Sequence, residues 1–182
     1  MTVRETDLAG VLVIEPRRFG DARGYFAEIY HADRYREAGV DAAFVQDNLS
    51  RSTRGTLRGL HAQAPPHAQA KLVQVLDGEV FDVAVDLRRD SPTFGQWHGE
   101  HLSAETGRQM YVPTGFAHGF CVVSASALFA YKCSDVYAPD TEIAVAWDDP
   151  DIGVAWPVAT PLLSDKDRAA PRLAALADAL PF

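Results

Sequence analysis

The sequence predicts an all-β fold, a jelly-roll β-barrel with a few short helices at its periphery. The main evidence is the alternation of apolar and polar residues at period two, which is typical of strands and dominates the chain. The alternating stretches are short and are separated by Gly, Pro, Asn and Asp at fairly regular intervals, as in sandwiches and barrels rather than βαβ units. A jelly roll leaves few strand edges free, and its mouth or lumen is a natural ligand cavity.

The first part of the chain contains three predicted strands and one predicted helix. The strands are GVLVIE at 10–15, FVQDNLS at 44–50 and KLVQVL at 71–76. The segment ADRYREAG at 32–39 predicts a short helix that ends at Gly39, since glycine commonly terminates helices.

The clearest strand is EVFDVAVDLR at 79–88. Its odd positions from Phe81 to Leu87 are apolar, whereas Asp82 and Asp86 fall on the other face. This pattern predicts a strand with one buried face and one polar face.

The turn before this strand and the elements after it complete the prediction. Asp77-Gly78 joins it to the preceding strand, and because an Asp-Gly pair is the strongest short hairpin signal, we expect these two strands to pair as a hairpin. Near the end of the chain, leucines recur at helical spacing beside alanines, which predicts a short helix at 170–180. Further short strands are expected at 108–113, 118–123, 127–133 and 142–147.

Length, composition and charge restrict the class of protein. The 182 residues are expected to form a single domain, 1–182, with a sizeable core. No apolar run approaches the roughly 20 residues needed to span a bilayer, and the start lacks the regions of a signal peptide, so we expect a soluble, cytoplasmic protein without a membrane partner. The net charge of −8, spread without blocks, argues against nucleic acid as a partner. Cys121 and Cys133 lie in apolar segments and are expected to be buried free thiols.

Several reactive side chains interrupt otherwise apolar strands. A buried polar group without a partner costs roughly 1 to 3 kcal/mol, so such residues are expected to be paired or functional. A metal site is disfavoured, because the chain has no His-x-His pair that one strand could present on one face. The residues are Gln46, Asn48, Arg58, His61, Lys71, His118, Tyr131 and Lys132.

A His, a Tyr and a Lys without a metal favour acid/base chemistry. His can take a proton near neutral pH if a carboxylate fixes its tautomer, Tyr can return one from the other side, and Lys can stabilise an enolate oxygen. The alternative is that His61 and His118 are satisfied core histidines and Tyr131 is a wall residue. For any one of them alone this alternative is the better interpretation, but together they favour a catalytic site.

Long motifs covering nearly the whole chain resemble one known family. They include GDARGYFAEIY, FVQDNLSRS, LRGLH, PPHAQAKLVQV, GEVFDVAVDLRRDSPTFGQW, VPTGFAHGF, YKCSDVYAP and LSDKD. The chain is similar in these motifs to the dTDP-4-dehydrorhamnose 3,5-epimerases, which invert C3 and C5 of a nucleotide-linked 4-keto-6-deoxy sugar. The resemblance implies a cupin-like double-stranded β-helix that needs no cofactor or metal and forms a homodimer.

The resemblance also implies the catalytic residues. The histidine of RGLH, His61, matches the general base, and Asp167 of the terminal KD matches its partner; the tyrosine of YK, Tyr131, matches the acid on the opposite face. Lys71 and His118 match residues near the sugar and its C4 oxygen. By spacing alone, Asp167 could instead be a helix-capping carboxylate, since it follows Ser164 as in a capping box.

The nucleotide-binding residues are implied in the same way. Tyr137 matches a ring that stacks on thymine, and Phe26 matches an aromatic residue delivered across a dimer interface. By composition alone, Glu28 and Glu142 would be solvated surface carboxylates. Arginine suits a diphosphate because its planar fork binds two oxygens at once. The residues that match thymidine diphosphate contacts are Arg23, Glu28, Gln46, Asn48, Arg58, Glu142 and Lys166.

One departure and three alternatives remain open at this point. The family often has Phe directly after the base histidine, where this chain has Ala62, so we expect a roomier cavity wall near His61. The sequence does not separate a double epimerase from a mono-epimerase that inverts one carbon only. A nucleotide-sugar-binding module without catalysis and a metal-dependent cupin are less favoured, because base and acid are both present and the metal ligands are not.

Overall fold

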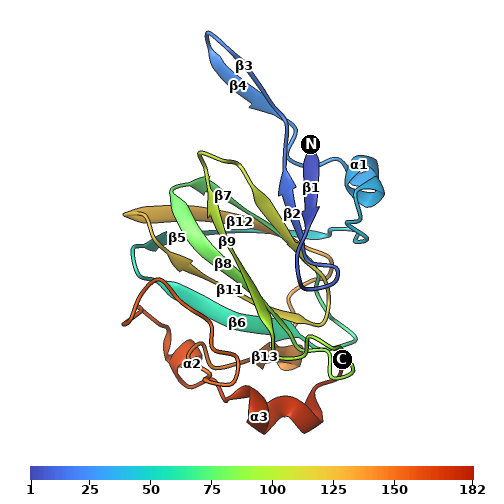
Figure 1. The fold of residues 1–182 in the computed structure, drawn as a ribbon, viewed down its shortest axis with the longest axis vertical. Helices are drawn as coiled ribbons and strands as arrows, with labels where there is room; N and C mark the ends of the chain where they lie inside the picture. The colour runs from blue at the N-terminus through green and yellow to red at the C-terminus, as the bar shows by residue number, and fades with distance from the viewer.

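Two antiparallel sheets packed face to face form the body of the protein, whose computed structural model describes residues 1–182 (Figure 1). The larger sheet has, in spatial order, β1 (Thr2–Glu5), β2 (Leu12–Glu15), β10 (Gln109–Val112), β7 (Lys71–Asp77), β12 (Ser126–Cys133) and β5 (Gln46–Thr53). The smaller has β13 (Glu142–Ala144), β6 (Leu57–Gln63), β11 (Phe116–Val122), β8 (Glu79–Asp86) and β9 (Trp97–Ser103). The predicted all-β jelly roll is confirmed.

The remaining elements lie at the periphery. The hairpin of β3 (Arg18–Asp21) and β4 (Gly24–Ala27) projects from one end of the body as an arm, and the C-terminal helices lie at the other end (Figure 1). The predicted helices are present but shorter, and none is long and apolar enough to cross a bilayer. The predicted helices are α1 (Ala32–Glu37) and α3 (Leu173–Leu176). The structure adds α2 (Asp165–Arg168) and the 3₁₀ turns η1 (Pro139–Thr141) and η2 (Ala177–Ala179).

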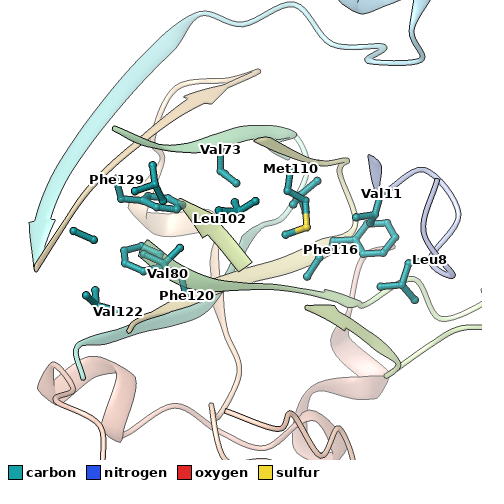
Figure 2. Close-up of a cluster of buried hydrophobic side chains, with 14 residues drawn as sticks. Leu8, Val11, Val73, Val80, Leu102, Met110, Phe116, Phe120, Val122 and Phe129 are labelled. Carbon is teal, nitrogen blue, oxygen red and sulfur yellow. The ribbon is translucent and has the colours of Figure 1, made fainter. Parts of the chain in front are cut away.

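The main core fills the space between the two sheets. Fourteen buried residues from both sheets and from the loop after β1 interdigitate there, among them Val73, Met110, Phe120 and Phe129 (Figure 2). Phe120 and Phe129 stack with ring centroids 4.1 Å apart, which joins the facing walls of the barrel. The two cysteines are buried free thiols, as predicted.

Strand β8 is buried on both faces, so the prediction of one polar face was wrong. The C-terminal segment, including Leu173, packs on the outer face of the smaller sheet against alternate residues such as Val83 and Val85. The other face of β8 points into the barrel, where Asp82 and Asp86 are both fully buried. Each carboxylate is therefore paired, because an isolated buried charge would be very costly.

The predicted hairpin at Asp77-Gly78 was also wrong. Strand β7 belongs to the larger sheet and β8 to the smaller one, so this dipeptide carries the chain from one sheet to the other. Gly78 has a φ of +79°, and a Cβ there would lie 2.1 Å from the Ser126 carbonyl oxygen. The dipeptide specifies a tight turn with positive φ, but the partners of the two strands come from elsewhere in the chain.

Substitution at this corner should separate steric crowding from backbone strain. Gly55 has nearly the same φ, +78°, but a Cβ there would meet nothing within 4 Å. We expect Gly55→Ala to lower the free energy of unfolding by about 1 to 2 kcal/mol, the cost of left-handed backbone for a residue with a Cβ. Gly78→Ala should cost roughly 1 to 3 kcal/mol more because of overpacking. Urea denaturation of both variants checks this, and equal losses would contradict it.

Candidate active site

The direction of the His61 side chain, in the LRGLH motif, depends on a bulge in β6. His61 lies opposite His118 of β11, and Arg58 lies opposite Phe120, so three steps along β6 match two steps along β11. In a regular strand residues three apart point to opposite faces. The extra residue in β6 returns Arg58 and His61 to the same face, and both line the same hollow.

Gly59 makes this bulge possible. It has a φ of +133°, and a Cβ there would lie 2.5 Å from the Cα of Gly119 in β11. The backbone that approaches Gly59 so closely belongs to the neighbouring strand β11.

The candidate site consists of two adjoining hollows between the sheets. The first has a volume of about 470 Å³ and the second a volume of about 430 Å³. Arg58 and His118 line the first hollow only. Both are lined by His61, Lys71 and Tyr131. His61 comes from the smaller sheet, whereas Lys71 and Tyr131 come from the larger one. A ligand between the sheets therefore meets these groups from two sides.

His61 and Asp167 form a hydrogen-bonded pair. His61 Nε2 lies 2.6 Å from Asp167 Oδ1, and the Asp167 side chain is only 5% exposed. Burial alone would raise the pKa of Asp167, but the hydrogen bond and charge of His61 outweigh it and hold the pKa below its ordinary value. The Ser164 hydroxyl caps α2 by accepting a hydrogen bond from the Asp167 N–H at 3.1 Å. The backbone of Asp167 thus takes part in the helix cap, while its carboxylate pairs with His61.

A second histidine–carboxylate pair joins His118 to Asp82, a residue that the sequence interpretation missed. His118 Nε2 lies 3.0 Å from both carboxylate oxygens, and both side chains are buried. Burial raises the pKa of Asp82, and the neighbouring His118 and Lys71 oppose that rise. The alternation of β8 carried a signal, since Asp82 shares its face with Val80 and Ala84, which belong to the inter-sheet core.

Lys71 and Tyr131 provide one cation and one phenol on the opposite wall. Lys71 Nζ donates a hydrogen bond to the His61 carbonyl oxygen at 3.2 Å. Burial lowers the pKa of Lys71 against the opposing charges of Cys133 and Asp82. Burial also raises the pKa of Tyr131, so its phenol keeps its proton at neutral pH and is suited to act as an acid.

Most of the predicted nucleotide-binding residues surround the hollows. Gln46 accepts the Tyr137 N–H at 2.9 Å and donates to Asn48 at 3.1 Å. Glu142 accepts hydrogen bonds from the Tyr137 hydroxyl, at 3.1 Å, and from Lys166 Nζ. This network ties the loop after β12 to α2, with Tyr137 and Glu142 lining the second hollow and Lys166 lining the first. Arg58 donates from Nε to Ser52 Oγ at 3.1 Å at the edge of the first hollow.

Three of the predicted nucleotide-binding residues are not brought to the hollows within one chain. Arg23 and Phe26 lie on the projecting arm, where Arg23 pairs with Asp21 and Phe26 is 69% exposed. Glu28 follows the arm and pairs with Arg34. Lys132 points away from the first hollow and pairs with Asp47 at 2.9 Å.

Ala62 contributes both to the second hollow and to the layer behind it. It lines that hollow beside His61, and it also belongs to the buried cluster on the outer face of the smaller sheet, together with Leu60 and Val145. The roomier wall expected at Ala62 stays a prediction. A larger residue here would change the packing of the outer layer. No group of three or more His, Cys, Asp or Glu side chains is placed to hold a metal ion.

The barrel therefore has a His–Asp pair on one wall and a Tyr and a Lys on the other. This arrangement is that of an enzyme that uses acid/base chemistry on a ligand held between two sheets. A family model described as dTDP-4-dehydrorhamnose 3,5-epimerase matches residues 5–175. The chain belongs to this family of isomerases.

Individual relatives agree with this assignment. The chain is 58% identical over 160 residues to dTDP-4-dehydrorhamnose 3,5-epimerase of Pseudomonas aeruginosa, covering 87% of this chain and 88% of that one. The Shigella flexneri enzyme of the same name is 54% identical over 168 residues, covering 92% and 93%. A crystal structure of dTDP-6-deoxy-D-glucose-3,5-epimerase from Legionella pneumophila in complex with dTDP-4-keto-L-rhamnose superposes with a TM-score of 0.95 at 51% identity, covering 99% and 97%.

The opposite surroundings of two lysines give a direct test of the site's electrostatics. Burial lowers the pKa of Lys71, whereas the hydrogen bond to Glu142 raises that of Lys166. The sequence has only three lysines, so carbon-13 NMR of labelled lysine side chains resolves them during a pH titration. We expect one lysine signal to titrate below the ordinary pKa of 10.5, and this signal should be absent from the spectrum of Lys71→Met. A Lys71 that titrates at or above 10.5 would contradict the description of the cavity.

Proposed function

We propose that residues 1–182 act as one cupin-like epimerase domain that inverts C3 and C5 of dTDP-4-dehydro-6-deoxy-D-glucose to give dTDP-4-dehydro-L-rhamnose. The single observation that carries this proposal is that His61, paired with Asp167, and Tyr131 line one cavity from facing sheets. Inversion of a carbon needs a proton removed from one face and another delivered to the opposite face. The sugar nucleotide bound by the Legionella relative supports the choice of ligand.

Proton removal is the role of His61. The 4-keto group acidifies the hydrogens at C3 and C5, since loss of either gives an enolate whose charge moves to the C4 oxygen. His61 Nε2 faces Asp167, so its N–H donates to that carboxylate and Nδ1 is left to accept the proton. The low pKa of Asp167 keeps it ionised, and the ionised form stabilises the imidazolium that develops.

The opposite wall and the second histidine complete the reaction. Lys71 and His118 stabilise the enolate oxygen, and the buried partner Asp82 holds the His118 ring in one orientation. Tyr131 then delivers a proton from the far face, because its raised pKa keeps the phenol protonated until it is needed. The chemistry requires neither a redox cofactor nor a metal.

The nucleotide is proposed to extend from the first hollow, which Arg58 and Lys166 line, into the second hollow, which Tyr137 lines. Tyr137 stacks on the thymine, while the side chains around it hold the sugar diphosphate. Cations placed within a protein of net charge −8 are sufficient to bind this anion. The residues in this role are Gln46, Asn48, Arg58, Glu142 and Lys166, together with Arg23, Phe26 and Glu28 from the partner's arm in a homodimer. We place the reaction in the cytoplasm, without a nucleic-acid or membrane partner.

Hydrogen exchange during turnover tests the reaction and the two roles together. Proton NMR of the substrate in deuterated water follows C3 and C5 separately. Wild-type protein should exchange both positions and form product; His61→Ala should abolish exchange and turnover, whereas Tyr131→Phe should retain some exchange without full inversion. The matched control is His101→Ala, because His101 also pairs with a carboxylate, Glu79, at 2.8 Å but lies outside both hollows.

Other outcomes of this experiment have defined meanings. Exchange at only one carbon of the wild-type reaction would favour a mono-epimerase, and none at either carbon would favour a binding module. Equal and mild losses in the His61 and Tyr131 variants would contradict the assigned roles.

Subunit complementation tests the proposed homodimer. His61→Ala removes the base, and a double variant at Arg23 and Phe26 to Ala removes the arm's contribution, so each should be inactive alone. A mixed dimer of the two has one site with an intact base and an intact arm, and should show about half of wild-type activity per dimer. Co-expression with two affinity tags isolates it. An inactive mixed dimer, or an active arm variant, would contradict delivery of the arm to the partner.

A further inference from the structure

Strand β5 presents a row of four polar side chains to the interior of the barrel. Its even positions are Gln46, Asn48, Ser50 and Ser52, and the residues between them are exposed. The row faces inward because Ser50 lies opposite Phe129, a fully buried residue of the inter-sheet core, and cross-strand neighbours share a face. These four side chains can therefore form hydrogen bonds with a ligand in the adjoining hollows.

Only one side chain of this row has no partner. Gln46 and Asn48 bond to each other, Asn48 also reaches Cys133 Sγ at 3.5 Å, and Ser52 accepts from Arg58. The Ser50 hydroxyl is buried and makes no hydrogen bond. Such a group costs roughly 1 to 3 kcal/mol, so its presence indicates that a partner arrives with the ligand.

The position of Ser50 indicates which part of the substrate this partner is. Ser50 lines the first hollow with His61 and Tyr131, and a turn about its single χ1 torsion redirects the hydroxyl. Along β5 it stands between Ser52, which holds Arg58, and Asn48, which lies opposite Tyr131. It is therefore between the proposed diphosphate anchor and the proposed acid.

The chemistry of the substrate places one hydroxyl in the matching position. The diphosphate is attached at C1, and the reacting carbons C3 and C5 are each two bonds away. The path to C3 passes through C2, which carries a hydroxyl, whereas the path to C5 passes through the ring oxygen, which has no proton to donate. C2 keeps its configuration during the reaction, so a contact to this hydroxyl persists while C3 and C5 are inverted in turn. We propose that the Ser50 hydroxyl binds the C2 hydroxyl of the hexose and makes the enzyme selective for sugars that carry it. This inference rests on the proposed epimerase function.

The test is a cycle of two proteins and two substrates. Wild type and Ser50→Ala are assayed with dTDP-4-keto-6-deoxy-D-glucose and with its 2-deoxy analogue. On the parent sugar, Ser50→Ala should lower kcat/KM roughly tenfold, as expected for one uncharged hydrogen bond. On the 2-deoxy analogue the two proteins should be equal, because the contact is already absent. Equal losses on both sugars would overturn the assignment.

Two further measurements exclude a structural role and a phosphate role. Because the free protein loses only an unpartnered hydroxyl, Ser50→Ala should keep or raise the thermal unfolding midpoint. Its calorimetric affinity for dTDP without a sugar should equal that of wild type. A lower midpoint, or weaker dTDP binding, would overturn the inference. If wild type itself does not epimerise the parent sugar, the proposed function fails instead, and the two failures are distinguishable.

Thr53→Ala is the matched control. Thr53 lies on the same strand, but its side chain is exposed and contacts neither hollow. Thr53→Ala removes one hydroxyl, as Ser50→Ala does, but at a position outside the hollows. The kcat/KM for both substrates should therefore be unchanged. Loss of activity in this variant similar to that in Ser50→Ala would show a general effect of changing β5 and would overturn the specific role.

Discussion

The geometry of the cavity depends on the close contact between β6 and β11 at Gly59 and Gly119. The two backbones approach so closely that a single Cβ at Gly59 would lie 2.5 Å from the Cα of Gly119. This contact accommodates the extra residue in β6 and turns Arg58 and His61 to the same face. With a regular strand, either Arg58 or His61 would point into the outer core. The direction of two functional side chains is thus decided by a residue that has no side chain.

The two-sheet architecture then separates groups that must act from opposite sides. His61, Arg58 and His118 belong to one sheet, and Lys71 and Tyr131 belong to the other. The apolar cluster between the sheets keeps these walls at a fixed separation and limits access of water to the charged groups. The resulting burial raises the pKa of Tyr131, which keeps the phenol protonated, and lowers the pKa of Lys71.

The sequence predicted the strands and most of the cavity residues because both depend on local pattern. Period-two alternation identifies inward faces, and the motifs around His61, Lys71 and Tyr131 are long. The errors concern contacts between distant segments. The turn at Asp77-Gly78 is encoded locally, but the partners of the strands on either side are not. Asp82 was interpreted as solvent-facing because alternation does not reveal that a C-terminal segment covers the other side of β8.

The position of Asp167 in the chain has a consequence for biosynthesis. This residue follows His61 by 106 positions and lies in α2, after all the strands of the barrel. Translation therefore makes the residues of every strand before it makes the carboxylate that pairs with His61. A chain that stops short of α2 contains all the strand residues but has no Asp167 beside the imidazole. Synthesis and docking of the C-terminal segment thus complete the histidine–carboxylate pair.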